Sequence, residues 1–125
     1  MEWTMEYLEN DSIVYVKLLS PANIERTKQM CLEMDQMARE HNTHKYLIDH
    51  RGIGVIMSVM DIDKVPGMLK EIEADFEGKI VLLLDSHEPK RNLFKFLKNV
   101  LRLVSMRVEL FYDDKEKAID WLKAN

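Results

Sequence analysis

The chain has 125 residues, 46% of them hydrophobic and 32% charged, a length and balance typical of one folded domain and not of a disordered chain. Its net charge of −4 argues against general nucleic-acid binding, which depends on a positive field facing the phosphates. The sequence shows neither a secretion signal at its N-terminus nor an apolar run of the roughly 18 residues that span a membrane. We therefore expect a cytoplasmic protein, and its single cysteine agrees with a reducing compartment.

The chain is predicted to begin with a β-hairpin that a helix follows. Two strand-like runs, residues 3–8 and 13–18, flank a polar cluster of turn-forming residues. Asn23 can then cap a helix over residues 24–41. That helix places three methionines and Cys31 on one side, so we interpret this side as core and the thiol as buried and unreactive.

The middle of the chain predicts strands of a parallel sheet. Residues 45–49 and 79–85 are apolar runs without clean alternation, as in strands covered on both faces. Between them, Ser58 can cap a short helix, and Pro66 suits the first turn of a second helix. Gly78 is a reasonable stop for that second helix.

Residues 90–107 are predicted to form a wide-faced, basic amphipathic helix. On a helical wheel their apolar side chains sweep about 180°, which is wider than the stripe of about 100° that packing on a sheet requires. The opposite face carries only positive charges. Residues 87–107 have a net charge of +5, so the rest of the chain has −9.

The last elements are a strand over residues 106–111 and a helix over residues 114–124, with Asp113 and Glu116 spaced as in a capping box. The predicted order is therefore an N-terminal antiparallel hairpin, followed by alternating strands and helices. This order indicates an α/β fold with right-handed crossovers and a mostly parallel five-stranded sheet.

Five segments together resemble the SpoIIAA-like family of STAS-related bacterial proteins. They are the hairpin, KYLIDHRG (45–52), SVMDIDKVPGMLKEI (58–72), KIVLLLD (79–85) and VELFYDDKEKAIDWL (108–122). The resemblance spans nearly the whole chain and implies one STAS/SpoIIAA-like domain over residues 1–125. That fold is shared in outline with anti-sigma-factor antagonists and Sec14-type lipid carriers, but a shared fold does not transfer an activity.

For the SpoIIAA-like branch, the resemblance implies a non-enzymatic carrier of an apolar, lipid-like molecule that associates reversibly with membranes by moving a helix over an apolar cavity. We accordingly expect no cofactor and no metal. The side chains predicted to contact the apolar ligand are Phe94, Phe96, Leu97, Leu101 and Val104. Those predicted to meet an anionic membrane surface are Lys95, Lys98 and Arg102.

A protein partner or a second copy of the chain is an alternative occupant of the wide apolar face. The function would then be that of a regulatory interaction module or homodimer of the anti-sigma-antagonist type. Those antagonists are switched by phosphorylation of a serine in the loop after the third strand. Here that loop, residues 49–54, reads DHRGIG and has no hydroxyl group, so we expect the phosphoserine switch to be absent.

An enzyme is the third alternative. Asp49, His50, Asp85 and His87 follow two neighbouring predicted strands, and ligands of open α/β sheets bind outside the carboxyl ends of strands. The sequence lacks close metal-ligand spacing, a phosphate-binding glycine loop and a nucleophile elbow. We therefore predict neither a catalytic residue nor a metal site.

Overall fold

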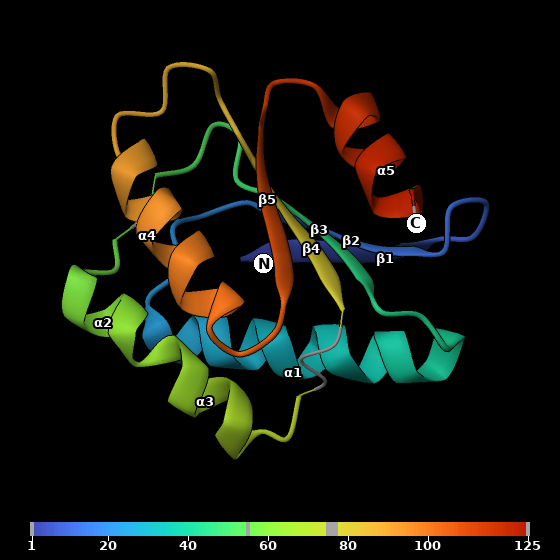
Figure 1. The fold of residues 1–125 in the computed structure, drawn as a ribbon, viewed down its shortest axis with the longest axis horizontal. Helices are drawn as coiled ribbons and strands as arrows, with labels where there is room; N and C mark the ends of the chain where they lie inside the picture. The colour runs from blue at the N-terminus through green and yellow to red at the C-terminus, as the bar shows by residue number, and fades with distance from the viewer. Residues whose placement is uncertain (1, 55, 75–77, 125) are drawn as a thin grey trace.

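A five-stranded sheet organises the structure, a computed structural model that describes residues 2–54, 56–74 and 78–124 (Figure 1). The strands lie side by side in chain order, from β1 to β5. β1 (Trp3–Leu8) and β2 (Ile13–Leu18) form the antiparallel hairpin. β3 (Lys45–Asp49), β4 (Lys79–Leu84) and β5 (Arg107–Tyr112) continue the sheet in parallel, so the predicted fold class is confirmed.

The helices cover the two faces of the sheet unequally (Figure 1). One face holds α1 (Ile24–His41), α2 (Val59–Asp63), α3 (Val65–Glu71) and α4 (Arg91–Arg102). The other face holds α5 (Lys115–Lys123). Two apolar cores result, a large one under α1 to α4 and a small one under α5.

Burial on both faces explains the apolar runs of the central strands. Along β3, Tyr46 and Ile48 point into the large core, whereas Leu47 points into the small one. All six residues of β4 are buried for the same reason. The absence of alternation in the sequence is therefore a consequence of a helix layer on each side.

Local capping explains where several helices begin. The side chain of Asn23 accepts a hydrogen bond from Arg26 N at 2.9 Å, and Ser58 caps α2, both as predicted. The structure adds that Asp61 completes a capping box with Ser58. The last helix differs from its prediction, because Asp114 and not Asp113 is its cap. Asp113 instead adopts a left-handed conformation with φ of 63°, and its carboxylate accepts a hydrogen bond from Ser86 N at 3.0 Å.

The basic helix α4 is shorter than predicted. It ends at Arg102 and not at residue 107, because Ser105 adopts a left-handed conformation with φ of 70°. The Met106 N–H then donates back to Leu101 O at 3.4 Å, which closes the last turn. Leu103 and Val104 consequently lie beyond the helix, and the apolar arc of the helix proper is narrower than the wheel indicated.

Gly78 does not stop the second short helix, since α3 ends at Glu71. A Cβ atom at Gly78 would lie 2.5 Å from His44 O, so glycine is required there for the close approach of two chain segments before β3 and β4. None of the helices in the described part of the chain is long and apolar enough to cross a membrane.

Candidate ligand-binding site

A cavity of about 90 Å³ lies between the sheet and the helices of the larger layer. Strands β2 to β4 form its floor, and helices α1, α3 and α4 form most of its walls. Its lining is almost entirely apolar. The lining residues are Leu18, Ala22, Thr27, Met30, Cys31, Met34, Asp35, Tyr46, Ile48, His50, Gly54, Met57, Val65, Leu69, Ala74, Ile80, Leu82, Leu97, Leu101 and Met106.

The cavity presents few polar groups to a ligand. The Thr27 hydroxyl already donates to Asn23 O at 2.8 Å, within the first turn of α1. Burial raises the pKa of the Cys31 thiol to about 12, helped by the nearby charge of Asp35, so the thiol stays protonated. The cavity is therefore suited to an apolar molecule and not to a charged one.

His50 is the histidine at the cavity wall. Its backbone N–H donates to Leu83 O at 2.8 Å, and its ring meets the ring of Phe94 edge to face, with centroids 4.9 Å apart. Burial lowers the pKa of His50 to about 4, while Asp49 acts to raise the pKa and Lys17 to lower it. The imidazole is therefore neutral at pH 7.

The structure separates the five predicted ligand-contacting residues. Leu97 and Leu101 line the cavity. Phe94 is only 2% exposed and packs against His50 without lining the cavity. Phe96 and Val104 are half-buried against the same core.

Four methionines also line the cavity, and the sequence analysis did not predict them as ligand-contacting residues. They are Met30, Met34, Met57 and Met106. The first two belong to the apolar face of α1, whose methionines were interpreted as ordinary core. Methionine is flexible and fills irregular space, so a methionine-rich face is also what an adaptable cavity requires. This composition was the one signal in the sequence that could have indicated the cavity.

The three predicted membrane-contacting cations differ in their surroundings. Lys95 is exposed. Lys98 forms an ion pair with Glu109 at 2.7 Å, and Arg102 lies 3.8 Å from the same carboxylate. Burial acts to raise the pKa of Glu109, but hydrogen bonds and the two cations lower it overall, so Glu109 is charged and neutralises part of the basic face.

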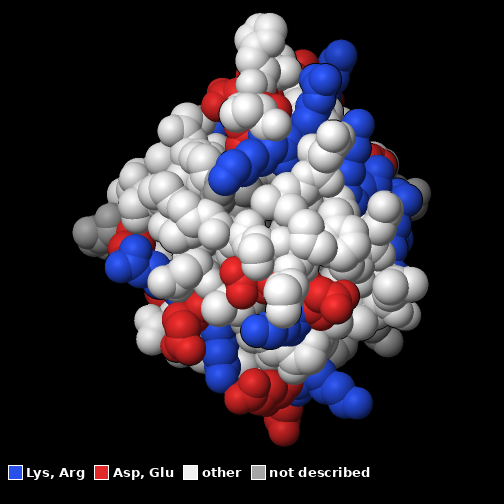
Figure 2. All heavy atoms as spheres, turned by 90° about the vertical axis from the view of Figure 1, so that its left-hand side faces the viewer, with Lys and Arg blue, Asp and Glu red and all other residues white. Residues whose placement is uncertain are grey.

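An exposed apolar surface lies beside these cations. Ile56 and Val59 are each 56% exposed and Met60 is 73% exposed, at the start of α2, which contacts α4. Leu103, just beyond α4, is 84% exposed. Figure 2 shows this side of the molecule as a broad uncharged area with Lys and Arg gathered above it and to its right.

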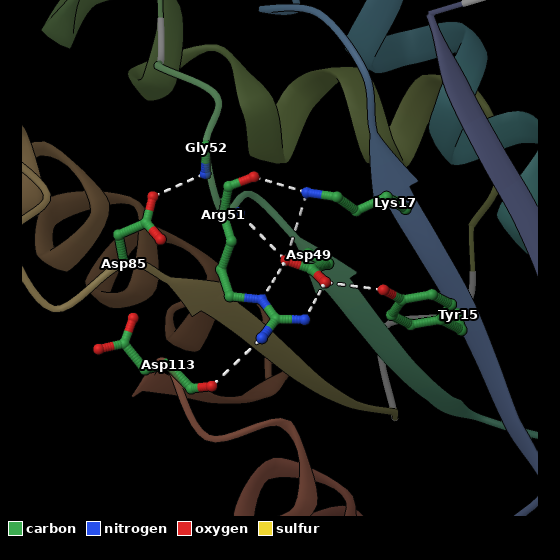
Figure 3. A network of polar contacts seen from close by, with 7 residues as sticks. All are labelled: Tyr15, Lys17, Asp49, Arg51, Gly52, Asp85 and Asp113. Carbon is green, nitrogen blue, oxygen red and sulfur yellow. Dashed lines mark hydrogen bonds and ion pairs between the residues drawn. The ribbon is translucent and has the colours of Figure 1, made fainter.

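A buried carboxylate holds the carboxyl ends of the strands together on the other face of the sheet (Figure 3). Asp49 has no exposed surface. Its carboxylate accepts hydrogen bonds from Arg51 Nε at 3.0 Å and from Arg51 Nη2 at 2.8 Å. The Tyr15 hydroxyl donates to it at 2.7 Å, and Lys17 Nζ lies 3.7 Å away. Arg51 also donates to Asp113 O at 3.2 Å, which links β3 to the loop after β5.

The network fixes the ionisation of its members. Burial acts to raise the pKa of Asp49, but the hydrogen bonds from Arg51 and Tyr15 and the charge of Lys17 lower it to about 2. Burial and the bond to Asp49 raise the pKa of Tyr15 to about 12. Every polar atom of this buried group has a partner, so the network is a structural clamp for the loop that follows β3.

The four residues of the enzyme alternative do not form one site. Asp49 and His50 are consecutive residues at the end of β3, so their side chains point to opposite faces of the sheet. Asp85 accepts a hydrogen bond from Gly52 N at 2.6 Å, and His87 is exposed. Among the described residues, no three His, Cys, Asp or Glu side chains come together as metal ligands.

The strand order and the unequal helix layers define a mixed α/β protein with the SpoIIAA-like fold. A solved crystal structure with a SpoIIAA-like fold, of an uncharacterized protein of the DUF3478 family from Shewanella loihica PV-4, resembles the chain with a TM-score of 0.61. The likeness covers 96% of this chain and 91% of that one, at 16% sequence identity, and it confirms the predicted fold. No protein-family model and no curated protein matches the sequence.

We predict that replacing Asp49 with asparagine lowers the free energy of unfolding by roughly 3 kcal/mol, because Arg51 then loses its buried counterion. Urea denaturation at pH 7 measures this loss. The matched control is Glu109→Gln at the partly exposed ion pair, which should lose less than about 1 kcal/mol. Equal losses in the two variants would contradict the role of Asp49 as a clamp.

We also predict that stability falls between pH 6.5 and pH 4 because of His50. The unfolded chain takes up a proton near the ordinary pKa of 6.5, whereas the folded chain resists protonation until about pH 4. One such proton changes the free energy of unfolding by about 1.4 kcal/mol for each pH unit in this window, and the stability is highest above pH 6.5.

Urea denaturation as a function of pH tests this window. In His50→Gln, the free energy of unfolding should decrease less between pH 6.5 and pH 4, because the proton taken up by His50 in the unfolded chain no longer contributes. The decrease between pH 3.8 and about pH 2, where Asp49 is protonated in the unfolded chain but still charged in the folded chain, should remain. An unchanged pH profile in His50→Gln would exclude His50 as the source.

Proposed function

We propose that this protein is a non-enzymatic binding domain that holds a small apolar, lipid-like molecule and makes reversible contact with anionic membranes. The observation that carries the proposal is the apolar cavity of about 90 Å³ in the larger core. Protein interiors are normally packed as densely as organic crystals, so a void of this size in a small domain calls for a cause.

The energetics favour a function for this cavity. An enclosed, empty apolar cavity destabilises a protein by about 24 cal/mol for each Å³, so a volume of about 90 Å³ corresponds to at most roughly 2 kcal/mol. Folding stabilities of small domains are only about 5 to 15 kcal/mol, so this loss is substantial. A bound apolar molecule would recover much of it by restoring van der Waals contacts.

The size and lining of the cavity set the class of ligand. An engineered cavity of about 150 Å³ in another protein binds benzene, so 90 Å³ accepts a short hydrocarbon segment without rearrangement. A longer chain would require the methionines to change rotamer or the short helices α2 and α3 to move outward. The neutral ring of His50 supplies one hydrogen-bonding group for a polar end such as a hydroxyl.

The exposed surface of α2 and α4 is suited to membrane contact. Ile56, Val59 and Met60 would enter the interface between headgroups and acyl chains, while Lys95 meets anionic headgroups. Lys98 and Arg102 would contribute less, since Glu109 holds them. Each free cation near an anionic surface contributes about 1 kcal/mol.

A protein-interaction module or homodimer is the second candidate, and the same exposed apolar side chains favour it. Isolated exposed apolar residues are common, but a cluster of large ones beside a cationic helix also suits a protein interface. Light scattering during gel filtration distinguishes the two functions. A stable dimer in the absence of lipid would support interaction over carriage.

We predict that filling the cavity abolishes binding of apolar molecules. The wild-type protein should show a rise in melting temperature with 1-alkanols from hexanol to dodecanol, with one length giving the largest rise. Cys31→Leu places extra carbon atoms in the cavity, so it should bind none of them while melting at the same or a higher temperature than unliganded wild type.

The control for this experiment is Leu32→Ala, on the neighbouring but exposed position of α1, which should keep the ligand response. Extraction of freshly purified protein with organic solvent, followed by mass spectrometry, identifies any molecule that is carried from the cell. Equal alkanol responses in Cys31→Leu and wild type would exclude this cavity as the binding site.

We predict that changing Lys95, Lys98 and Arg102 together to glutamine weakens binding to anionic vesicles by roughly tenfold to a hundredfold at low salt. Vesicle sedimentation with phosphatidylserine-containing and pure phosphatidylcholine vesicles measures the effect. The control carries the same charge change on α5, with Lys115, Lys117 and Lys123 replaced by glutamine. If both triple variants bind as wild type does, the electrostatic role of α4 is wrong.

A further inference from the structure

The strand β1 leaves one edge of the sheet open. β2 is its strand neighbour on one side, and no described strand pairs with its other side. An open edge presents unpaired backbone donors and acceptors, which an added strand can bind. The other open edge, at β5, lies at the opposite end of the strand order.

The pairing register identifies the backbone groups that face outward. Leu19 N donates to Glu2 O at 2.9 Å, which makes these two residues a hydrogen-bonded pair of the hairpin. Bonded and non-bonded pairs alternate along antiparallel strands. The N–H and C=O groups of Trp3, Met5 and Tyr7 therefore point away from β2, toward the open edge.

A groove of about 580 Å³ runs beside these outward groups, between β1 and α1. The side chains of Trp3, Met5 and Met37 give the groove its apolar floor, and all three are half-buried. A half-buried indole with two thioethers is a surface on which an aliphatic chain can lie. The apolar floor alone would suit many partners, so the charge of the rim determines which kind of side chain the groove favours.

The rim of the groove is acidic. Its lining contains the carboxylates of Glu2, Glu33 and Glu40 and no Lys or Arg. Arg26 Nε forms an ion pair with the carboxylate of Glu2 at 2.8 Å. Among the described residues, Glu33 and Glu40 have no cation within ion-pair distance. Gln36 donates to Glu40 at 3.3 Å, which holds that carboxylate on the groove side of α1.

An apolar floor inside an acidic rim matches the chemistry of lysine and arginine. Their aliphatic stems lie on apolar surface while their charged ends reach outward to carboxylates, and a cation also binds favourably over an indole ring. We propose that the groove binds an extended, basic segment of another protein, which adds to β1 as a sixth strand and directs Lys or Arg side chains over Trp3 toward Glu33 and Glu40.

Charge argues against a second copy of the chain as the occupant. Pairing of β1 with β1 of another copy would bring two acidic rims together, and like charges placed opposite each other destabilise a strand pair. Pairing of β1 with β5 of another copy would be a head-to-tail contact, which builds a ring or an open filament and not a two-chain complex. A basic partner of different sequence avoids both problems.

The test uses the full chain and a nine-residue peptide that alternates lysine with valine, with a glutamate and valine peptide as its counterpart. At low salt the lysine peptide should bind saturably, and the glutamate peptide should not. Hydrogen exchange followed by NMR should show the amides of Trp3, Met5 and Tyr7 exchanging at least about tenfold more slowly in the complex, because each gains a hydrogen-bond acceptor.

A pair of matched variants separates the groove from general attraction to an acidic protein. Glu33→Gln with Glu40→Gln should weaken peptide binding about fivefold, as expected for two surface ion pairs. Glu116→Gln with Asp120→Asn makes the same charge change at exposed positions of α5 and should leave the affinity unchanged.

Four results would each overturn the proposal. They are the absence of saturable binding, binding without slower exchange of the three outward amides, equal weakening in the two double variants, and slow exchange of these amides in a dimer of the chain alone. Slower exchange in the complex together with selective weakening by Glu33→Gln and Glu40→Gln would support it.

Discussion

The buried carboxylate of Asp49 is the constraint on which the arrangement of the strand ends and of the loop after β3 depends (Figure 3). Removing a charge from water is unfavourable by several kcal/mol, so the fold has to surround this group with donors. Arg51, Tyr15 and Lys17 provide them, and in doing so they join β2, β3 and the loop before α5. The loop after β3 is fixed as a consequence, and His50 faces the cavity on the opposite side of the sheet.

A network of charged groups on one face of the sheet is combined with an apolar cavity on the other. The side under α5 contains the small apolar core and the charged clamp, whereas the side under α1 to α4 contains the cavity and the methionines around it. The ligand site proposed above would benefit from this division, because the strands would hold a constant floor while flexible side chains adapt to a bound molecule. The helices α2 and α3 are the shortest of the structure's described helices, and α2 carries the exposed side chains of Val59 and Met60.

The strand and helix pattern was predictable from the sequence because it rests on local physics. The uninterrupted apolar run of β4, the cap at Asn23 and the cap at Ser58 each follow from neighbouring residues, and the fold followed from their order. The cavity was not predictable, since a void among Met30, Leu97 and Ile80 depends on distances between elements remote in the chain. Ser105 ended α4 early through its backbone conformation, which no periodicity indicates.

The sheet order also bears on how the chain reaches its structure. Each strand lies next to the strand that precedes it in the sequence, so no strand has to enter between two that are already paired. The hairpin of β1 and β2 closes a very short loop, and every later strand can add to the growing edge after one crossover. The entropy lost on closing loops is therefore divided over several small steps. Such a route is compatible with folding during synthesis on the ribosome, and it limits the exposure of unpaired strand edges.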